Sequence, residues 1–293
     1  MKKILGITLG MVLALGLLCF PSNIRADEAT GNVTIINSAP TISSVLLLNQ
    51  AGDDAAIDLE VGSTVIVTAT ANITDPNGGE TISSASATLY HNTTDSEAAD
   101  DENTHITNSS CTLGDASGND KLVTCKFTMD YMTLPGTWTV NITALDNDSA
   151  QVSGTDDNTV NTLAGLDVVE TSIDFGALEL GGKSSTATQM VVKSMGNVQI
   201  DAQYKGTNFT CGVGIIDVSN IKYGLDDVAY DSLTTVLSDT DVTQTAFNLG
   251  IRGVDTEDGI DSTKTEYWGI QIPATGVSGA CTNTLTVTAT SDS

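Results

Sequence analysis

Apolar and polar residues alternate along most of this chain. In the stretch GTWTVNITALDND, Trp138, Val140 and Ile142 fall on one face and Asn141 falls on the other. A period of two residues is typical of a β-strand with one buried face. The same pattern, bounded by turn residues, predicts further strands in the first half at residues 41–49, 63–74, 82–90, 122–131 and 150–154.

The end of the chain shows the same period. Trp268 and Ile270 alternate within YWGIQIP, and Leu285 and Val287 alternate within the last apolar segment. No amphipathic helix stands out, so we predict an all-β protein made of two tandem β-sandwiches. Because Trp138 and Trp268 lie on apolar faces, we expect both in cores; a platform that stacks on sugars is the alternative.

The first residues have the pattern of a secretory signal peptide. Lys2 and Lys3 precede the uncharged run Ile4–Phe20, and Ala26 is the small residue expected at a cleavage site. A retained N-terminal anchor is the alternative. We therefore divide the chain into a signal peptide (1–26), a β-prone N-terminal segment (27–39), a first sandwich (40–163) and a second sandwich (164–293). No further long apolar run follows, so no membrane span is expected in the mature chain.

The mature chain is strongly acidic. Loss of Lys2, Lys3 and Arg25 with the signal peptide changes the formal charge from −26 to −29. Such a surface repels nucleic acid and anionic lipid, and it is typical of a protein that stays soluble outside a cell. We expect a secreted protein, extracellular or at the cell surface.

Four cysteines remain after removal of Cys19 with the signal peptide. An even number in an exported chain predicts disulfides, for which three connectivities are possible. The pairing that keeps each bond within one sandwich is Cys111–Cys125 and Cys211–Cys281. None of these residues belongs to a C-x-x-C motif, which disfavours zinc binding and redox chemistry.

Several polar residues on the strands lie in N-glycosylation sequons. Asn141 and Asn72 occupy the polar faces of their strands, and each is followed two places on by Thr. Ordinary polar strand residues are the alternative interpretation. The seven candidate acceptors are Asn32, Asn72, Asn92, Asn108, Asn141, Asn147 and Asn208.

Both halves resemble known Ig-like modules. With an early TDPNG turn and a late PGTWTV strand, residues 38–161 resemble Ig-like modules of prokaryotic secreted proteins. In the second half, the ranges 174–176 (DFG) and 195–197 (MGN), with Gly181 and the late IQIP, resemble the hydin-like, choice-of-anchor type Ig-like module. Lys193 and Ser194 depart from that pattern, in which Asn is usual. The resemblance implies a β-sandwich used for adhesion or scaffolding.

Catalytic and cofactor signals are weak. The mature chain has only His91 and His105, both in or beside the acidic stretch HNTTDSEAADDENTH, where we expect solvated side chains. Calcium is the one metal worth considering, at the 75–80 turn (DPNGGE), at the 146–148 turn (DND), or at Asp255–Glu266. The last resembles an EF-hand loop but has Ile260 where Gly is required. We predict neither an enzyme nor an obligatory cofactor.

We therefore expect an exported structural or adhesive protein of the cell surface or extracellular matrix, with surface or matrix proteins, including other copies of itself, as partners. A carbohydrate- or calcium-binding accessory module is an alternative. Another alternative concerns the β-prone segment containing Val33, Ile35 and Ile36. We favour its pairing with its own first sandwich as an edge strand. If it adds instead to the next subunit, the protein is the subunit of an extracellular filament.

Overall fold

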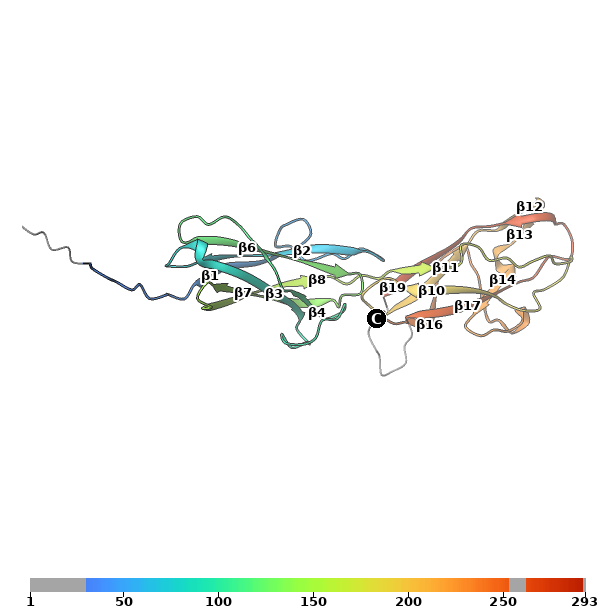
Figure 1. Cartoon of the computed structure of the whole chain (residues 1–293). Helices are drawn as coiled ribbons and strands as arrows, with labels where there is room; N and C mark the ends of the chain where they lie inside the picture. The colour runs from blue at the N-terminus through green and yellow to red at the C-terminus, as the bar shows by residue number, and fades with distance from the viewer. Residues whose placement is uncertain (1–29, 253–261, 292–293) are drawn as a thin grey trace, which may run out of the picture. The chain divides into compact units, whose positions relative to one another are not determined.

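The computed structural model describes residues 30–252 and 262–291, which are mostly antiparallel strands (Figure 1). The predicted signal peptide (1–26) and most of the EF-hand-like stretch lie outside the described residues. Among the described residues, no helix has the length and apolarity that a membrane crossing requires. The helical turns present are short 3₁₀ segments: η1 (Gly79–Thr81), η2 (Val218–Asn220) and η3 (Tyr230–Ser232).

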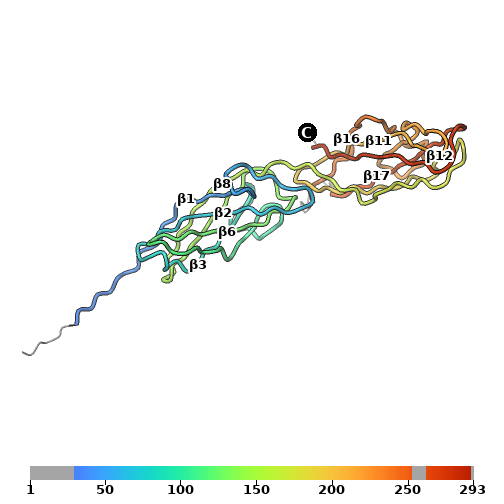
Figure 2. The backbone as a smooth tube through the Cα atoms, turned by 90° about the horizontal axis from the view of Figure 1, so that it is seen from above, coloured from blue at the N-terminus to red at the C-terminus, as the bar shows by residue number. Residues whose placement is uncertain are grey.

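The first sandwich is formed by two four-stranded sheets. Its strands are β1 (Thr41–Leu48), β2 (Thr64–Thr74), β3 (Ile82–His91), β4 (His105–Asn108), β5 (Thr112–Leu113), β6 (Asp120–Asp130), β7 (Gly136–Asp146) and β8 (Gln151–Val160). The sheet orders are β1-β2-β6-β5 and β4-β3-β7-β8. β2 and β6 run side by side from the pair Thr64 and Asp130 to the pair Thr74 and Asp120 (Figure 2). The strands predicted in this half are all present in the two sheets, whereas β4 and β5 were not predicted.

The core of the first sandwich consists of the predicted apolar faces. Trp138, Val140 and Ile142 on β7 are fully buried, and Cys125 on β6 lies in the same cluster. A close contact explains why a glycine, Gly154, stands within β8. A Cβ at this position would lie only 2.9 Å from the Cγ2 atom of Ile42. The alternation of the sequence thus fixes which face of each sheet is buried.

The second sandwich contains the remaining strands. These are β9 (Leu166–Val168), β10 (Thr188–Ser194), β11 (Ile200–Gly206), β12 (Phe209–Val213), β13 (Ile215–Ile216), β14 (Ile221–Gly224), β15 (Thr235–Val236), β16 (Val242–Leu249), β17 (Thr263–Ile270), β18 (Ser278–Thr282) and β19 (Leu285–Ser291). They form a five-stranded sheet, β15-β14-β17-β10-β9, and two three-stranded sheets, β16-β11-β19 and β13-β12-β18. A separate apolar cluster fills this sandwich.

An aromatic group lies at the centre of the second core. Tyr204, Tyr223 and Trp268 are buried, and their ring centroids lie 4.8 to 5.2 Å apart. Edge-to-face and stacked contacts at these distances stabilise a core beyond the effect of buried area alone. Since Trp138 and Trp268 are both buried, the expectation that they are core residues is confirmed, and neither forms a sugar-stacking platform.

The N-terminal segment differs from expectation. Residues 30–40 form no strand, and the first strand begins at Thr41. The side chains of Val33, Ile35 and Ile36 are each more than 80% exposed. The favoured expectation that this segment pairs with its own first sandwich is therefore wrong. The first hydrogen bonds from this part of the chain to the strands and turns of the first sandwich are those of Asn37 and Ser38.

Candidate functional site

A groove opens into the second sandwich. It consists of two adjoining hollows of about 690 and 790 Å³, which share Ile173, Phe175, Phe209 and Cys281 in their linings. Apolar residues of β9 and β19 also line the first hollow: Leu166, Val168, Leu285 and Val287. Polar residues line the hollows as well, and the first also contains Asp167 and Glu170. Volumes of this size suit a peptide segment with both apolar and polar side chains.

The two cores differ in how completely they are covered. Among the described residues, six partly buried apolar side chains pack against the first core, whereas thirteen pack against the second. Leu285, Val287 and Ala289 on β19 are all half-buried, although they face the core. The groove therefore leaves one side of the second core open.

The walls of the groove contain an unpaired strand edge. β19 pairs with β11 along its whole length, and no other strand of the described residues pairs with it. The segment 169–187 lines both hollows, but it forms no strand and has only the isolated bridge between Lys183 and Gln271. Sequence reasoning predicted the strands here but missed the groove.

The base of the N-terminal segment is fixed to the first sandwich. The Asn37 side-chain amide donates to the Asp146 carboxylate at 2.6 Å, and the Ser38 backbone N–H donates to Asn77 Oδ1 at 2.8 Å. The hydrogen bond from Asn37, together with backbone donors in the following turn, lowers the pKa of Asp146. These contacts fix the point from which residues 30–36 extend.

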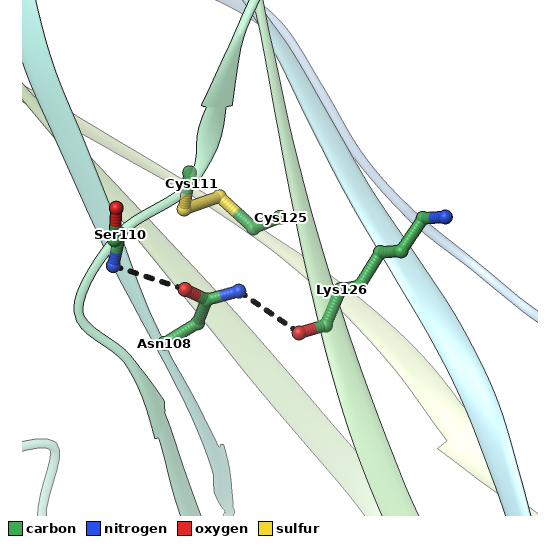
Figure 3. The surroundings of a disulfide bond; sticks show 5 residues. All are labelled: Asn108, Ser110, Cys111, Cys125 and Lys126. Carbon is green, nitrogen blue, oxygen red and sulfur yellow. Dashed lines mark hydrogen bonds between the residues drawn. A yellow bond between two sulfur atoms is a disulfide. The ribbon is translucent and has the colours of Figure 1, made fainter.

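Both disulfides form in the expected pairing. Cys111 is bonded to Cys125 over a separation of 14 residues, and Cys211 to Cys281 over 70 residues. The first bond is buried in the first core, as Cys125 is fully inaccessible (Figure 3). The second joins directly opposed residues of β12 and β18 beside the groove.

The sequons fall in different environments. Asn92, Asn147, Asn32 and Asn208 are exposed, whereas Asn72 and Asn141 are half-buried on the outward faces of central strands. Oδ1 of Asn141 is buried and has no hydrogen-bond partner. The use of all seven as glycan acceptors stays a prediction.

The side-chain amide of Asn108 forms hydrogen bonds through both its nitrogen and its oxygen. Its Nδ2 donates to the carbonyl oxygen of Lys126 at 2.9 Å, and its Oδ1 accepts from the Ser110 N–H at 3.0 Å (Figure 3). The bond to Lys126 joins β4 to β6 beside the first disulfide, and the bond from Ser110 holds the turn after β4. A glycan on Nδ2 would have to replace the bond to Lys126, so Asn108 is the least suitable acceptor in the folded chain.

Both histidines are buried, which corrects the expectation of solvated loop side chains. His105 contacts the Asp100 carboxylate at 2.9 Å and the Ser96 carbonyl at 3.1 Å; His91 contacts the Thr93 hydroxyl at 2.8 Å and the Pro135 carbonyl at 3.2 Å. Each ring is held by two polar partners, so the histidines fix the acidic loop. Neither has a hydroxyl on one nitrogen and a carboxylate on the other, as a catalytic triad requires.

The candidate calcium turns are explained by ordinary turn chemistry. Asp75 accepts hydrogen bonds from the Asn77 N–H and the Thr81 hydroxyl, and Asp146 accepts from the N–H groups of Asp148 and Ala150. Within residues 30–252 and 262–291, no group of three or more His, Cys, Asp and Glu side chains could hold a metal ion.

One acid is buried among the aromatic residues of the second core. Glu266 is fully inaccessible, with Tyr204 Oη 3.3 Å and Gln244 Nε2 3.4 Å from its carboxyl oxygens. Burial raises the pKa of Glu266 to about 7, and burial beside this acid raises the pKa of Tyr223 to about 12. No feature of the sequence singled out Glu266 among the 37 acidic residues.

No protein-family model and no curated protein sequence matches the chain. Among solved structures, the chain is similar to the CsuC-CsuE chaperone–tip adhesion subunit pre-assembly complex of Acinetobacter baumannii, with 10% identity, a TM-score of 0.38, and coverage of 84% of this chain and 99% of that one. It is also similar to the C-terminal domain of the Streptococcus agalactiae antigen I/II polypeptide BspA, with 11% identity, a TM-score of 0.22, and coverage of 86% and 100%.

A third similar structure is a carbohydrate-binding module of the β-sandwich superfamily, with 12% identity, a TM-score of 0.28, and coverage of 87% of this chain and 97% of that one. The assignment of two β-sandwiches rests on the strand pairings of the chain itself.

Proposed function

We propose that this chain is an exported, non-catalytic structural protein of the cell surface or extracellular matrix, and that its copies assemble into filaments through the N-terminal segment. Export is supported by the signal-peptide pattern, the two disulfides and the acidic composition. A filament of this kind could also serve in surface adhesion.

The single observation that carries the filament proposal is the unpaired apolar segment. Val33, Ile35 and Ile36 are exposed, and Val, Ile and Thr are residues that favour strands. Exposed apolar clusters of this kind are typical of interaction sites. Addition of the segment to a sheet edge of another copy would satisfy its backbone and bury its side chains. Such head-to-tail contacts do not close, so they produce filaments.

No specific observation favours the accessory-module alternative. Both tryptophans are in cores, and the turns considered for calcium satisfy their carboxylates internally. A binding module for sugars would be expected to present aromatic side chains on its surface.

Deletion of residues 27–37 tests the filament proposal. We expect the mature chain to form fibres visible by electron microscopy and the truncated chain to stay monomeric by light scattering, because the donor segment is lost. The deletion also removes the bond from Asn37 to Asp146, and the substitutions below keep that bond. The double variant Val33→Asp with Ile35→Asp should behave like the deletion. Asn32→Ser removes the sequon but keeps the apolar residues, so it should assemble normally. A mature chain that is monomeric at every concentration and forms no fibres would refute the proposal.

A further inference from the structure

We infer that the groove of the second sandwich is the acceptor for the N-terminal segment of another copy. In this arrangement residues 32–36 pair with the free edge of β19 (Leu285–Ser291), and Val33 and Ile35 point into the hollows. The inference rests on the proposed filament function, and it adds the site at which one subunit holds the next.

The chemistry of the groove matches that of the segment. Val33 and Ile35 are two residues apart, so in a strand they lie on one face roughly 7 Å from each other. Leu285 and Val287 on β19 have the same spacing and line the first hollow. A strand laid against β19 would place its apolar side chains beside theirs and cover the half-buried face of the second core.

The free edge of β19 lacks the usual protection against strand addition. Exposed edges are normally blunted by charged side chains, by proline or by a covering element. Residues 267–291 contain no charged residue, and neither do residues 29–52, although the chain has 37 acidic residues. Asp167 and Glu170 line the first hollow, but residues 29–36 carry no charge and can enter it without like-charge repulsion.

The length of the segment favours another copy over the same chain. Asn37 is bonded to Asp146 at one end of β7, and the chain leaves the first sandwich after Val160, which pairs with Gly136 at the other end. The ten residue steps of β7 span roughly 34 Å. Val33, four residues from Asn37, reaches at most about 14 Å. Val33 therefore cannot reach the Gly136 end of β7, where the chain passes from the first sandwich to the second.

The segment 169–187 does not occupy the strand position itself. Ile173 and Phe175 contribute to the walls of both hollows, but no ladder joins this segment to β19. The edge of β19 is therefore available to an incoming strand, with the segment 169–187 forming the opposite wall.

Complementary variants test this site. Val287→Phe fills the first hollow with an apolar side chain and keeps the N-terminal segment, whereas the chain lacking residues 27–37 keeps the groove. We expect each variant alone to be monomeric and their mixture to form a one-to-one dimer by light scattering, which cannot grow further. Thr288→Phe places the same side chain on the exposed outer face of β19 and should assemble into fibres like the unmodified chain.

The outcomes separate this inference from the proposed function. If Val287→Phe forms fibres normally, or if the mixture stays monomeric, the groove is not the acceptor. The filament function itself is then judged by the deletion alone. Should Val287→Phe fail to fold, hydrogen exchange on the truncated chain with a peptide of residues 29–37 decides. We expect slower exchange in β19, and no effect of a peptide carrying Asp at positions 33 and 35. Protection confined to another strand would overturn the inference.

Discussion

At the scale of single residues, the second core contains a buried acid, Glu266, whose pKa is raised by burial. Hydrogen bonds from Gln244 and Tyr204 and the positive charge of Lys264 lower the pKa of Glu266. Desolvation by burial outweighs them and raises this pKa to about 7. The folded chain then holds a proton that the unfolded chain has already lost at intermediate pH.

This difference gives a signed prediction for stability. The stabilising effect of the protonated Glu266 is complete below about pH 4.5 and is lost as the pH rises through about 7. The shift corresponds to about 3 kcal/mol at most. Glu266→Gln should remove this dependence and stabilise the chain above pH 7, as measured by urea unfolding from pH 5 to 8. Glu179→Gln, at an exposed position, serves as the control. Parallel pH profiles for all three proteins would contradict the prediction.

At the scale of elements, periodicity predicted the long strands well. The expected segments 63–74 and 122–131 correspond to β2 (Thr64–Thr74) and β6 (Asp120–Asp130), because each has one continuous apolar face. β8 extends to Val160, beyond the predicted 150–154, since Asp156 and Asp157 interrupt the apolar pattern. Its polar residues are accommodated by tertiary contacts, such as the Leu47 N–H that donates to Asp156 at 2.8 Å.

The candidate site was less accessible to sequence reasoning. The groove lies between segments as distant in the sequence as 166–175 and 281–287, which line it without pairing with each other. Such an arrangement leaves no local signal in the sequence. The burial of His91 and His105 was missed for a related reason: their loop partners, Thr93 and Asp100, look like any solvated polar residues in the sequence. The N-terminal segment could be recognised from its β-prone composition, but the exposure of Val33, Ile35 and Ile36 could not.

The two disulfides allow the sandwiches to be tested separately. Cys111→Ala with Cys125→Ala opens a loop of 14 residues and should lower the stability of the first sandwich by about 3 kcal/mol. Because each sandwich has its own core, calorimetry should show one unfolding transition moving and the other staying in place. Cys211→Ala with Cys281→Ala is the matched comparison and should move the other transition. Equal shifts of both transitions by either variant would contradict independent cores.

At the scale of the whole molecule, charge and assembly oppose each other. A mature chain of formal charge −29 repels its own copies, and this repulsion acts over distances set by the ionic strength. The proposed contact lies between two uncharged parts, residues 29–36 and β19, so it gains nothing from ion pairing. Long-range repulsion is therefore the main electrostatic term in filament growth.

Salt should consequently promote assembly. Raising the ionic strength from about 0.01 M to about 0.15 M shortens the screening length from about 30 Å to about 8 Å, which weakens repulsion without affecting an apolar contact. We expect the critical concentration for fibre formation, measured by light scattering, to fall severalfold. The variant Val33→Asp with Ile35→Asp should remain monomeric at both salt concentrations. Calcium chloride at matched ionic strength should act like sodium chloride; a much larger effect would favour a specific calcium site. Weaker assembly at high salt would mean that ion pairs, and not the groove, hold the subunits together.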